Sequence, residues 1–231
     1  LLIRPRNLIF HERGNAWNIN KSKNFIIRIN SAISSKIVCN SNASKYLLMK
    51  KFSVPEEKLI LIYNGVNDDI FNENFLNFKK YGYESEFRIL FIGRIESNKG
   101  LHTLIKAMSL LNSKVFSLQI VGDGSLKNQM YKLVKDLKVK NVNFVGYKKD
   151  IKDFLYNAHL LVVPSIREPL GNVVIEGALS GTPIIASKID GITEIINNNS
   201  YGYLIEPKNI VSKEFINQIV PLPQFVIKNN E

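Results

Sequence analysis

The sequence has little cysteine and few residues of the kinds that bind metals. Its 231 residues include one cysteine, Cys39, and three histidines. A single cysteine excludes an internal disulfide framework and is typical of a reducing cytoplasm. The sequence contains no Asp-x-Asp pair and no histidine or cysteine cluster with ligand spacing. We therefore expect no metal site.

Long apolar runs are also missing. No run reaches the roughly 18 residues that a membrane-spanning helix needs. The opening segment, LLIRPRNLIF, is too short and too basic for a signal peptide. The chain starts at Leu1 instead of methionine, so we expect further residues upstream. We interpret the protein as cytoplasmic.

Positive charge is plentiful, with a formal net charge of +11, but it is not concentrated. The close lysine pairs are 50–51, 79–80 and 148–149. Nucleic-acid binders more often gather their basic residues on one face, so we expect no nucleic-acid partner. The net charge is compatible with a solvated surface, with binding of a phosphorylated ligand or with contact at the inner face of an anionic membrane. Charge alone does not decide between these possibilities.

Short apolar runs alternate with amphipathic helical patterns between residues 85 and 206. The predicted strands are 87–95, 117–121, 143–146, 159–164, 183–187 and 202–205. The predicted helices are 100–111, 126–137, 151–156, 171–179 and 193–196, with one more near 213–219. This alternation forms right-handed βαβ units and a parallel sheet. The sequence therefore predicts an α/β fold, with a Rossmann-like domain over residues 85–220.

The remaining residues indicate a second domain. A helical pattern at 24–35 and a strand pattern at 35–40 suit the end of an earlier Rossmann-like domain, and a short apolar run at 58–62 precedes a turn signal at Asn64-Gly65. Some 65 residues are too few for a domain of the usual 100–200 or so. We interpret 1–65 as the tail of an incomplete domain, 66–84 as a connection and 221–231 as a tail, since Pro221 and Pro223 break helices.

The predicted topology also predicts a site. In the usual strand order, 3-2-1-4-5-6, ligands bind beyond the carboxyl ends of strands 1 and 4. The loop after strand 1 contains Gly93, Arg94 and Lys99. Glycine lets the backbone approach a ligand closely, and an arginine fork with a lysine point charge suits a diphosphate.

The loop after strand 4 carries Glu168 and is followed by a helix that opens at Leu170, Gly171 and Asn172. The free N–H groups at that helix start can bind phosphate or sugar oxygens. Glu176 is the only charge in this apolar helix. A buried carboxylate is costly unless it is paired, so we expect Glu176 to hold a polar ligand, such as a ribose, or a fixed partner.

These motifs together resemble glycosyltransferase family 4. Glu168 and Glu176 match its E-x7-E motif within REPLGNVVIEGALSGTPIIA, and GRIESNKG is similar to its GR-x-x-x-x-KG loop. VGDGSL and the hinge segment YNGVNDDIF also match, and the matches span residues 35–210. Asn67 and Gly177 stand where the family usually has Asp and Ala.

The resemblance implies a GT-B fold and a retaining, metal-independent sugar transferase without a cofactor. It implies that Arg94 and Lys99 stabilise the leaving diphosphate, that Glu176 holds the ribose and that Glu168 contacts the donor sugar. Val145 and Tyr147 would lie by the base. His11, in IFHERGNAWN, resembles the histidine that reaches the donor sugar from the N-terminal domain.

The same resemblance implies the partners. The donor is expected to be a nucleotide diphosphate sugar, UDP-linked in preference to GDP-linked, carrying a hexose. The acceptor is expected to be a glycan or lipid-linked sugar in bacterial surface polysaccharide synthesis. Helix N–H groups and the two cations would do the work of a metal by stabilising charge on the diphosphate.

Two other functions stay open, and a third is discounted. A nucleotide-sugar epimerase of the same fold would release sugar without an acceptor, through a glycal. A truncated chain would bind nucleotide without activity. An NAD oxidoreductase fits less well, because GDGSLK lacks the third glycine and follows strand 2 instead of strand 1.

Overall fold

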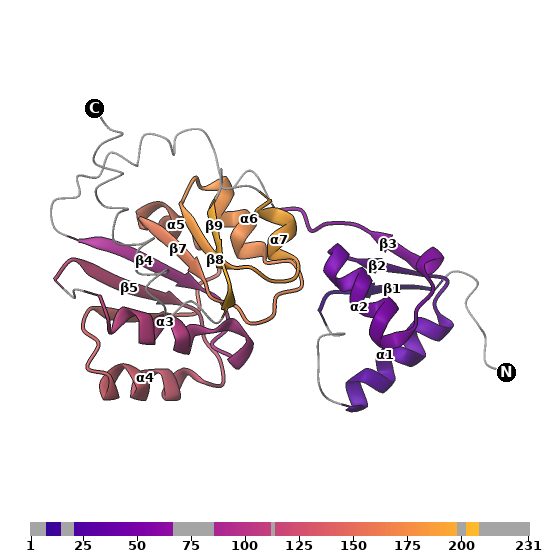
Figure 1. Cartoon of the computed structure of the whole chain (residues 1–231), viewed down its shortest axis with the longest axis horizontal. Coiled ribbons are helices and arrows are strands. Elements are labelled where there is room, and N and C mark those ends of the chain that lie inside the picture. The colour runs from indigo at the N-terminus through magenta and orange to yellow at the C-terminus, as the bar shows by residue number, and fades with distance from the viewer. Residues whose placement is uncertain (1–7, 15–20, 67–85, 112–113, 198–201, 208–231) are drawn as a thin grey trace.

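The computed structural model of the chain describes residues 8–14, 21–66, 86–111, 114–197 and 202–207. Within these residues the chain forms two lobes, each built on a parallel sheet (Figure 1). No helix in the described residues is both long and apolar enough to cross a membrane.

The first lobe has three parallel strands in the order β1-β2-β3 and two long helices. In chain order its elements are β1 (Ile9–Glu12), α1 (Lys21–Ile33), β2 (Lys36–Cys39), α2 (Asn42–Phe52), the 3-10 helix η2 (Glu56–Lys58) and β3 (Leu59–Leu61). Its small core gathers Ile37, Leu48, Phe52 and Leu59. Strand β1 and helix α2 were not among the sequence predictions, since β1 is short and α2 mixes lysines into its apolar pattern.

The second lobe has six parallel strands in the order β6-β5-β4-β7-β8-β9, the predicted Rossmann-like order. Its strands are β4 (Phe87–Ile92), β5 (Phe116–Val121), β6 (Val142–Gly146), β7 (Leu160–Val163), β8 (Ile184–Ser187) and β9 (Gly202–Ile205). Its helices are the 3-10 helix η5 (Ser97–Lys99), α3 (Leu101–Met108), α4 (Lys127–Asp136), α5 (Lys152–Asn157), α6 (Asn172–Leu179) and α7 (Ile192–Ile195). The predicted α/β class is confirmed.

Alternating side chains of the strands build two core layers, one on each face of this sheet. On β4, Ile89 and Phe91 pack toward α3 and α4, while Leu90 packs on the opposite face toward α5, α6 and α7. Burial on both faces explains why these strands read as continuous apolar runs. Strand β4 ends at Ile92 and not at residue 95 as predicted, because the chain turns at Gly93.

Three predicted segments fall mainly outside the described residues: the connection 66–84, the helix near 213–219 and the tail 221–231. The proposed domain boundaries stay predictions.

Candidate nucleotide-sugar site

A cleft of about 920 Å³ opens at the carboxyl ends of β4 and β7. That volume lies within the roughly 300–1,000 Å³ typical of ligand sites. Both lobes line it. The second lobe contributes Ile92, Gly93, Arg94, Glu96, Ser97, Asn98, Lys99, Ile166, Arg167, Glu168, Pro169, Leu170, Gly171, Asn172, Val173 and Glu176, and the first lobe contributes Arg13, Gly14, Asn40 and Asn64.

The two loops of the second lobe are bound to each other at Asn98. Its carbonyl oxygen accepts hydrogen bonds from the backbone N–H of Ile166 at 2.8 Å and of Arg167 at 3.4 Å. The first loop then ends at Gly100, which has φ 69° and lies so close to Pro164 that an added Cβ would be 1.9 Å from its carbonyl oxygen. These contacts hold both loops in one arrangement before a ligand arrives.

Lys99 and Glu168 form an ion pair across the two loops. Their side chains are only 18% and 10% exposed. The Glu168 carboxylate also accepts a hydrogen bond from Ser165 Oγ at 3.2 Å. The two residues lie together in the cleft, as the topology predicted, and they are bonded to each other.

Arg94 pairs differently. Its Nη1 lies 2.9 Å from Glu96 Oε1, and the side chain is 68% exposed. An exposed pair of this kind contributes at most about 1 kcal/mol, so Arg94 can leave Glu96 for a ligand at little cost.

Glu176 faces the cleft from the second turn of α6. Burial raises the pKa of its carboxyl. Its carboxylate makes no hydrogen bond or ion pair with any residue that the structure describes. A half-buried acid without a protein partner is the arrangement expected of a group that binds a ligand hydroxyl.

Helix α6 begins at the cleft with Gly171 as its N-cap, and no described side chain caps it. The first-turn N–H groups of an α-helix have no intrahelical partners and carry partial positive charge. Leu170, Gly171 and Asn172 all line the cleft, so this helix start can receive an anion or sugar oxygen.

The loop before α7 is hydrogen-bonded to the backbone of Glu168. The backbone N–H of Glu168 donates to Asp190 Oδ2 at 3.2 Å, and the N–H of Gly191 donates to the Glu168 carbonyl at 3.2 Å. Burial raises the pKa of Asp190, and the hydrogen bond from Glu168 and the charge of Arg167 partly oppose that rise.

The first lobe supplies cleft residues that the sequence did not identify. Arg13 and Gly14 follow β1, where the Gly14 N–H donates to the buried Glu12 Oε1 at 2.6 Å. Asn40 and Asn64 follow β2 and β3. Arg13 and Asn40 come directly after β1 and β2, and Asn64 lies three residues beyond the end of β3. A place just beyond the carboxyl end of a parallel strand is the signal that could have indicated them.

Three predicted site residues are not brought to the cleft. His11 is exposed within β1, paired in register with Val38. Val145 packs against the core cluster beside α5 and α7, and Tyr147 is 73% exposed. None of the three lines the cleft, and their roles stay predictions.

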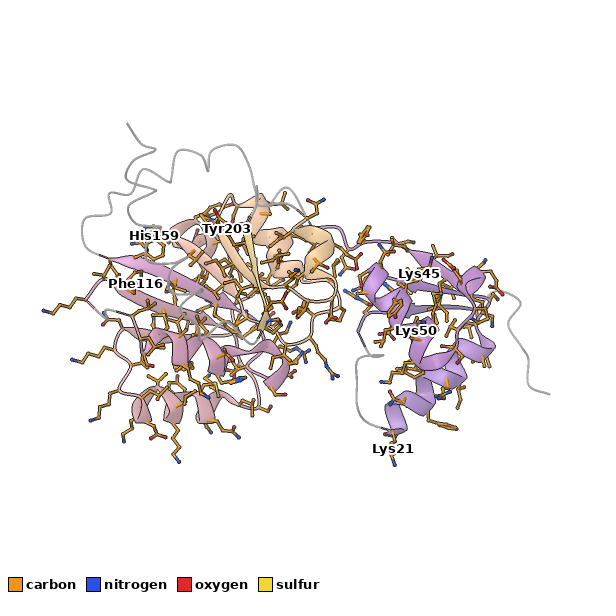
Figure 2. All side chains as sticks on the ribbon, in the orientation of Figure 1. Lys21, Lys45, Lys50, Phe116, His159 and Tyr203 are labelled. Carbon is orange, nitrogen blue, oxygen red and sulfur yellow. The ribbon has the colours of Figure 1, made fainter. Side chains whose placement is uncertain are left out.

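His159 lies at the opposite end of the sheet from the cleft. His159 precedes β7 and accepts a hydrogen bond from the Arg88 N–H at 2.8 Å. Figure 2 shows His159 and Phe116 at the end of the six-stranded sheet that points away from the three-stranded lobe. Over the described ranges, no three acidic, histidine or cysteine side chains gather closely enough to hold a metal ion.

A family model, Glycosyl transferases group 1, matches residues 73–220. The chain belongs to the glycosyl transferases group 1 family. An uncharacterized glycosyltransferase of Methanocaldococcus jannaschii is 33% identical over 187 residues, which cover 76% of the chain and 48% of that relative. The UDP-Gal:alpha-D-GlcNAc-diphosphoundecaprenol alpha-1,3-galactosyltransferase of Escherichia coli is 30% identical and covers 81% of the chain and 51% of that enzyme. This group 1 chain thus spans about half the length of these relatives.

The fold of the group 1 chain also matches solved structures. The Anabaena HepE protein, crystallised with UDP and glucose, superposes with a TM-score of 0.79 at 23% identity over 93% of this chain and 62% of HepE. Staphylococcus aureus TarM superposes with a TM-score of 0.80 at 23% identity over 96% of the chain and 44% of TarM. At this identity the likeness establishes the parallel-sheet fold of both lobes and nothing further.

Proposed function

We propose that this chain carries the donor site of a retaining glycosyltransferase of family 4, with the E-x7-E motif formed by Glu168 and Glu176. The observation that supports it best is the meeting of Lys99, Glu168, Glu176 and the start of α6 in one cleft at the switch point of the sheet. The proposed donor is a UDP-linked hexose, with GDP as the alternative base. HepE, a neighbour in fold, was crystallised with UDP-glucose.

The charges in the cleft account for the chemistry. Breaking the bond between the sugar and the diphosphate leaves negative charge on phosphate oxygens, which preorganised donors stabilise. Arg94 moves from its exposed pair to the diphosphate, and the α6 N–H groups add fixed positive potential. Lys99 keeps its bond to Glu168 and shares its remaining hydrogens with a phosphate oxygen.

The two carboxylates take separate roles. Glu176 has no protein partner in the described residues and accepts hydrogen bonds from the ribose hydroxyls. Glu168, held by Lys99 and Ser165, contacts hydroxyls of the donor sugar. Retention then follows from acceptor attack on the face of the leaving group, with a phosphate oxygen taking the acceptor proton.

We propose that the acceptor is a glycan or lipid-linked sugar in surface polysaccharide synthesis. The Escherichia coli relative is named for a diphosphoundecaprenol acceptor, and a Staphylococcus aureus relative, 28% identical, for capsular polysaccharide biosynthesis. Transfer to such an acceptor with retained anomeric configuration, followed by NMR, would support this proposal. Release of a glycal without an acceptor would indicate an epimerase instead.

Calorimetric titration with UDP, GDP and their glucose conjugates tests the donor site. We expect one base to bind, with at least tenfold weaker binding in Glu176→Ala and in Arg94→Ala, because a charge-assisted hydrogen bond contributes about 1.5–3 kcal/mol. Glu206→Ala is the control, since Glu206 is exposed and, in the part of the chain that the structure describes, pairs with Lys188 alone, at 3.5 Å. Equal binding by all three variants would contradict the assignment.

We also propose a cytoplasmic enzyme that contacts an anionic membrane surface. Lys132, Lys135, Lys138 and Lys140, on α4 and the turn after it, are exposed and form a lysine edge. Such lysines contribute about 1 kcal/mol each near anionic lipid. Vesicles containing phosphatidylglycerol should bind the protein at low salt, and Lys132→Glu with Lys135→Glu should weaken that binding. Equal binding to neutral phosphatidylcholine vesicles would contradict it.

A further inference from the structure

One carboxylate, that of Glu194, joins the two lobes. Glu194 lies on α7 in the second lobe, and the four donors from which it accepts hydrogen bonds among the described residues all belong to the first lobe. Its Oε2 accepts from the Asn42 N–H at 2.9 Å, from Asn42 Nδ2 at 3.1 Å and from the Tyr63 hydroxyl at 2.9 Å. Its Oε1 accepts from the Ala43 N–H at 2.8 Å.

The first turn of helix α2 lacks an acidic residue, and Glu194 supplies the negative charge and the hydrogen-bond acceptors. The N-cap of this helix, Ser41, accepts only from the Ser44 N–H among the first-turn amides, at 3.0 Å. Among the described residues of their own lobe, the amides of Asn42 and Ala43 therefore have no acceptor. A carboxylate at a helix N-terminus gains from both these hydrogen bonds and the helix dipole. The contact is thus complementary in charge as well as in hydrogen bonding.

Tyr63 reinforces the contact. The pKa of its hydroxyl is raised, first by burial and then by the hydrogen bond to Glu194 and its negative charge. The hydroxyl therefore keeps its proton at neutral pH and remains a donor to Glu194. Asn42 Nδ2 also donates to the Tyr63 oxygen at 2.9 Å, so the three side chains form one network.

Glu194 is connected to the cleft through the start of α7. Asp190 and Gly191, which precede this helix, are the two residues hydrogen-bonded to the backbone of Glu168. The fit is tight, because a Cβ on Gly191 would lie 2.1 Å from the Pro169 carbonyl oxygen. A displacement of α7 would therefore move the loop that carries Glu168.

A second interlobe hydrogen bond lies at the cleft itself. Asn64 Nδ2 donates to Asn172 Oδ1 at 2.8 Å, and Asn172 is the first residue of α6. Asn172 is exposed, Asn64 is partly buried and a single hydrogen bond joins them, so this connection is weaker than that of Glu194.

We propose that Glu194 is a positioning residue for sugar transfer. Its contact with the first turn of α2 holds the lobes together and keeps the Glu168 loop in place, and this role rests on the proposed function. Glu194 does not line the cleft, so it acts through the Glu168 loop. Donor affinity, which comes from the second lobe, should therefore depend little on it, whereas turnover should depend on it strongly.

The test compares Glu194→Gln with the control Glu206→Gln in the full chain, with UDP and UDP-glucose as probes. Glutamine keeps the size of the side chain but loses the charge and one acceptor. In Glu194→Gln, hydrogen exchange at the amides of Asn42 and Ala43 should be at least tenfold faster. Turnover of UDP-glucose should fall at least tenfold, with the Kd for UDP within twofold. The control should match the unmodified protein.

Asn42→Asp tests the same contact from the other lobe. The new carboxylate faces Glu194 and repels it, so turnover should fall as it does in Glu194→Gln. In the double variant the repulsion is gone, so the two losses should not add. Thermal unfolding of each variant shows whether a loss reflects misfolding.

The results distinguish the interlobe contact of Glu194 from its positioning role in sugar transfer. Unchanged exchange at Asn42 and Ala43 in Glu194→Gln would overturn the interlobe contact. Faster exchange with unchanged turnover, or losses that simply add in the double variant, would overturn the positioning role. If the unmodified protein transfers no sugar, the proposed function fails together with the positioning role, while exchange alone still decides the contact.

Discussion

The Lys99–Glu168 and Arg94–Glu96 pairs border the same cleft but differ in burial. The first pair is 18% and 10% exposed, and the second is 68% and 34% exposed. Removing one partner of a buried pair leaves an uncompensated charge, whereas an exposed charge is solvated. Lys99 thus has a structural role in addition to any role toward phosphate.

Lys99→Met should therefore lower the free energy of unfolding by about 3 kcal/mol, and Arg94→Met by less than about 1 kcal/mol. Urea denaturation measures both. The double variant Lys99→Met with Glu168→Gln removes the orphaned charge and should recover most of the loss. Equal costs for the two single variants would show that the Lys99 pair is solvated.

Glu176 should be destabilising at neutral pH. Burial raises the pKa of its carboxyl, so the folded chain binds more protons at this site than the unfolded chain. Its contribution to stability therefore falls as pH rises from the unfolded pKa, about 4.3, through the raised folded pKa. Glu176→Gln should raise the Tm by roughly 1–2 °C at pH 7 and leave it unchanged near pH 4.

The same substitution should weaken UDP-sugar binding, because the ribose loses a charged acceptor and keeps only the neutral amide oxygen. A gain in stability with a loss of affinity is the expected behaviour of a residue kept for binding. Calorimetric unfolding at the two pH values, with the Glu206→Gln control, measures the stability effect. A lower Tm at pH 7 would contradict it.

At the scale of elements, the cleft depends on how two loops leave their strands. The end of the first loop lies against Pro164. Gly100 makes this close approach possible, because a Cβ there would overlap the Pro164 carbonyl oxygen. Gly146, at the end of β6, also has a positive φ, of 83°, but an added Cβ there meets nothing within 4 Å. An alanine would be strained by the left-handed backbone at both positions, but only at Gly100 would its Cβ also overlap other atoms.

Gly146→Ala should cost about 1 kcal/mol of stability, from the left-handed backbone alone. Gly100→Ala should cost at least about 2 kcal/mol more, since its Cβ overlaps a carbonyl oxygen. It should also weaken UDP binding by displacing Lys99. Denaturant unfolding and titration measure the two effects, and equal costs would show that the loop relaxes.

At the scale of the whole molecule, the two lobes have separate cores of different size. The first lobe holds one small cluster, and the second holds a layer on each face of its sheet. A lobe with the smaller core should unfold first. The contacts of Glu194 are polar and too few to merge the two cores.

Hydrogen exchange should therefore show faster opening in β2 than in β5. UDP at about 100 times its Kd should stabilise β5 by up to about 2.7 kcal/mol, with a smaller effect on β2, because the proposed site lies mainly in the second lobe. Equal protection of both strands by UDP would instead indicate one cooperative unit.

The sequence by itself determined the second lobe, its strand order and the two cleft loops. Strands buried on both faces leave unbroken apolar runs, and the winding rule then selects one edge of the sheet. Arg94, Lys99, Glu168, Gly171 and Glu176 line the cleft at that edge, and their roles stay predictions. These signals are local or follow from chain order, and both are readable without coordinates.

Only the tertiary structure decided which of these residues contact one another and what the first lobe adds. The pairing of Lys99 with Glu168 joins positions 69 residues apart, and the contact of Glu194 with Asn42 joins positions 152 apart. No periodic pattern in the sequence indicates contacts between residues so far apart in the chain, because each contact depends on how one element packs against another. Arg13 was missed because the four residues of β1 carry too little pattern to show which of them faces the cleft. His11 was suggested by the family resemblance, and its role stays a prediction.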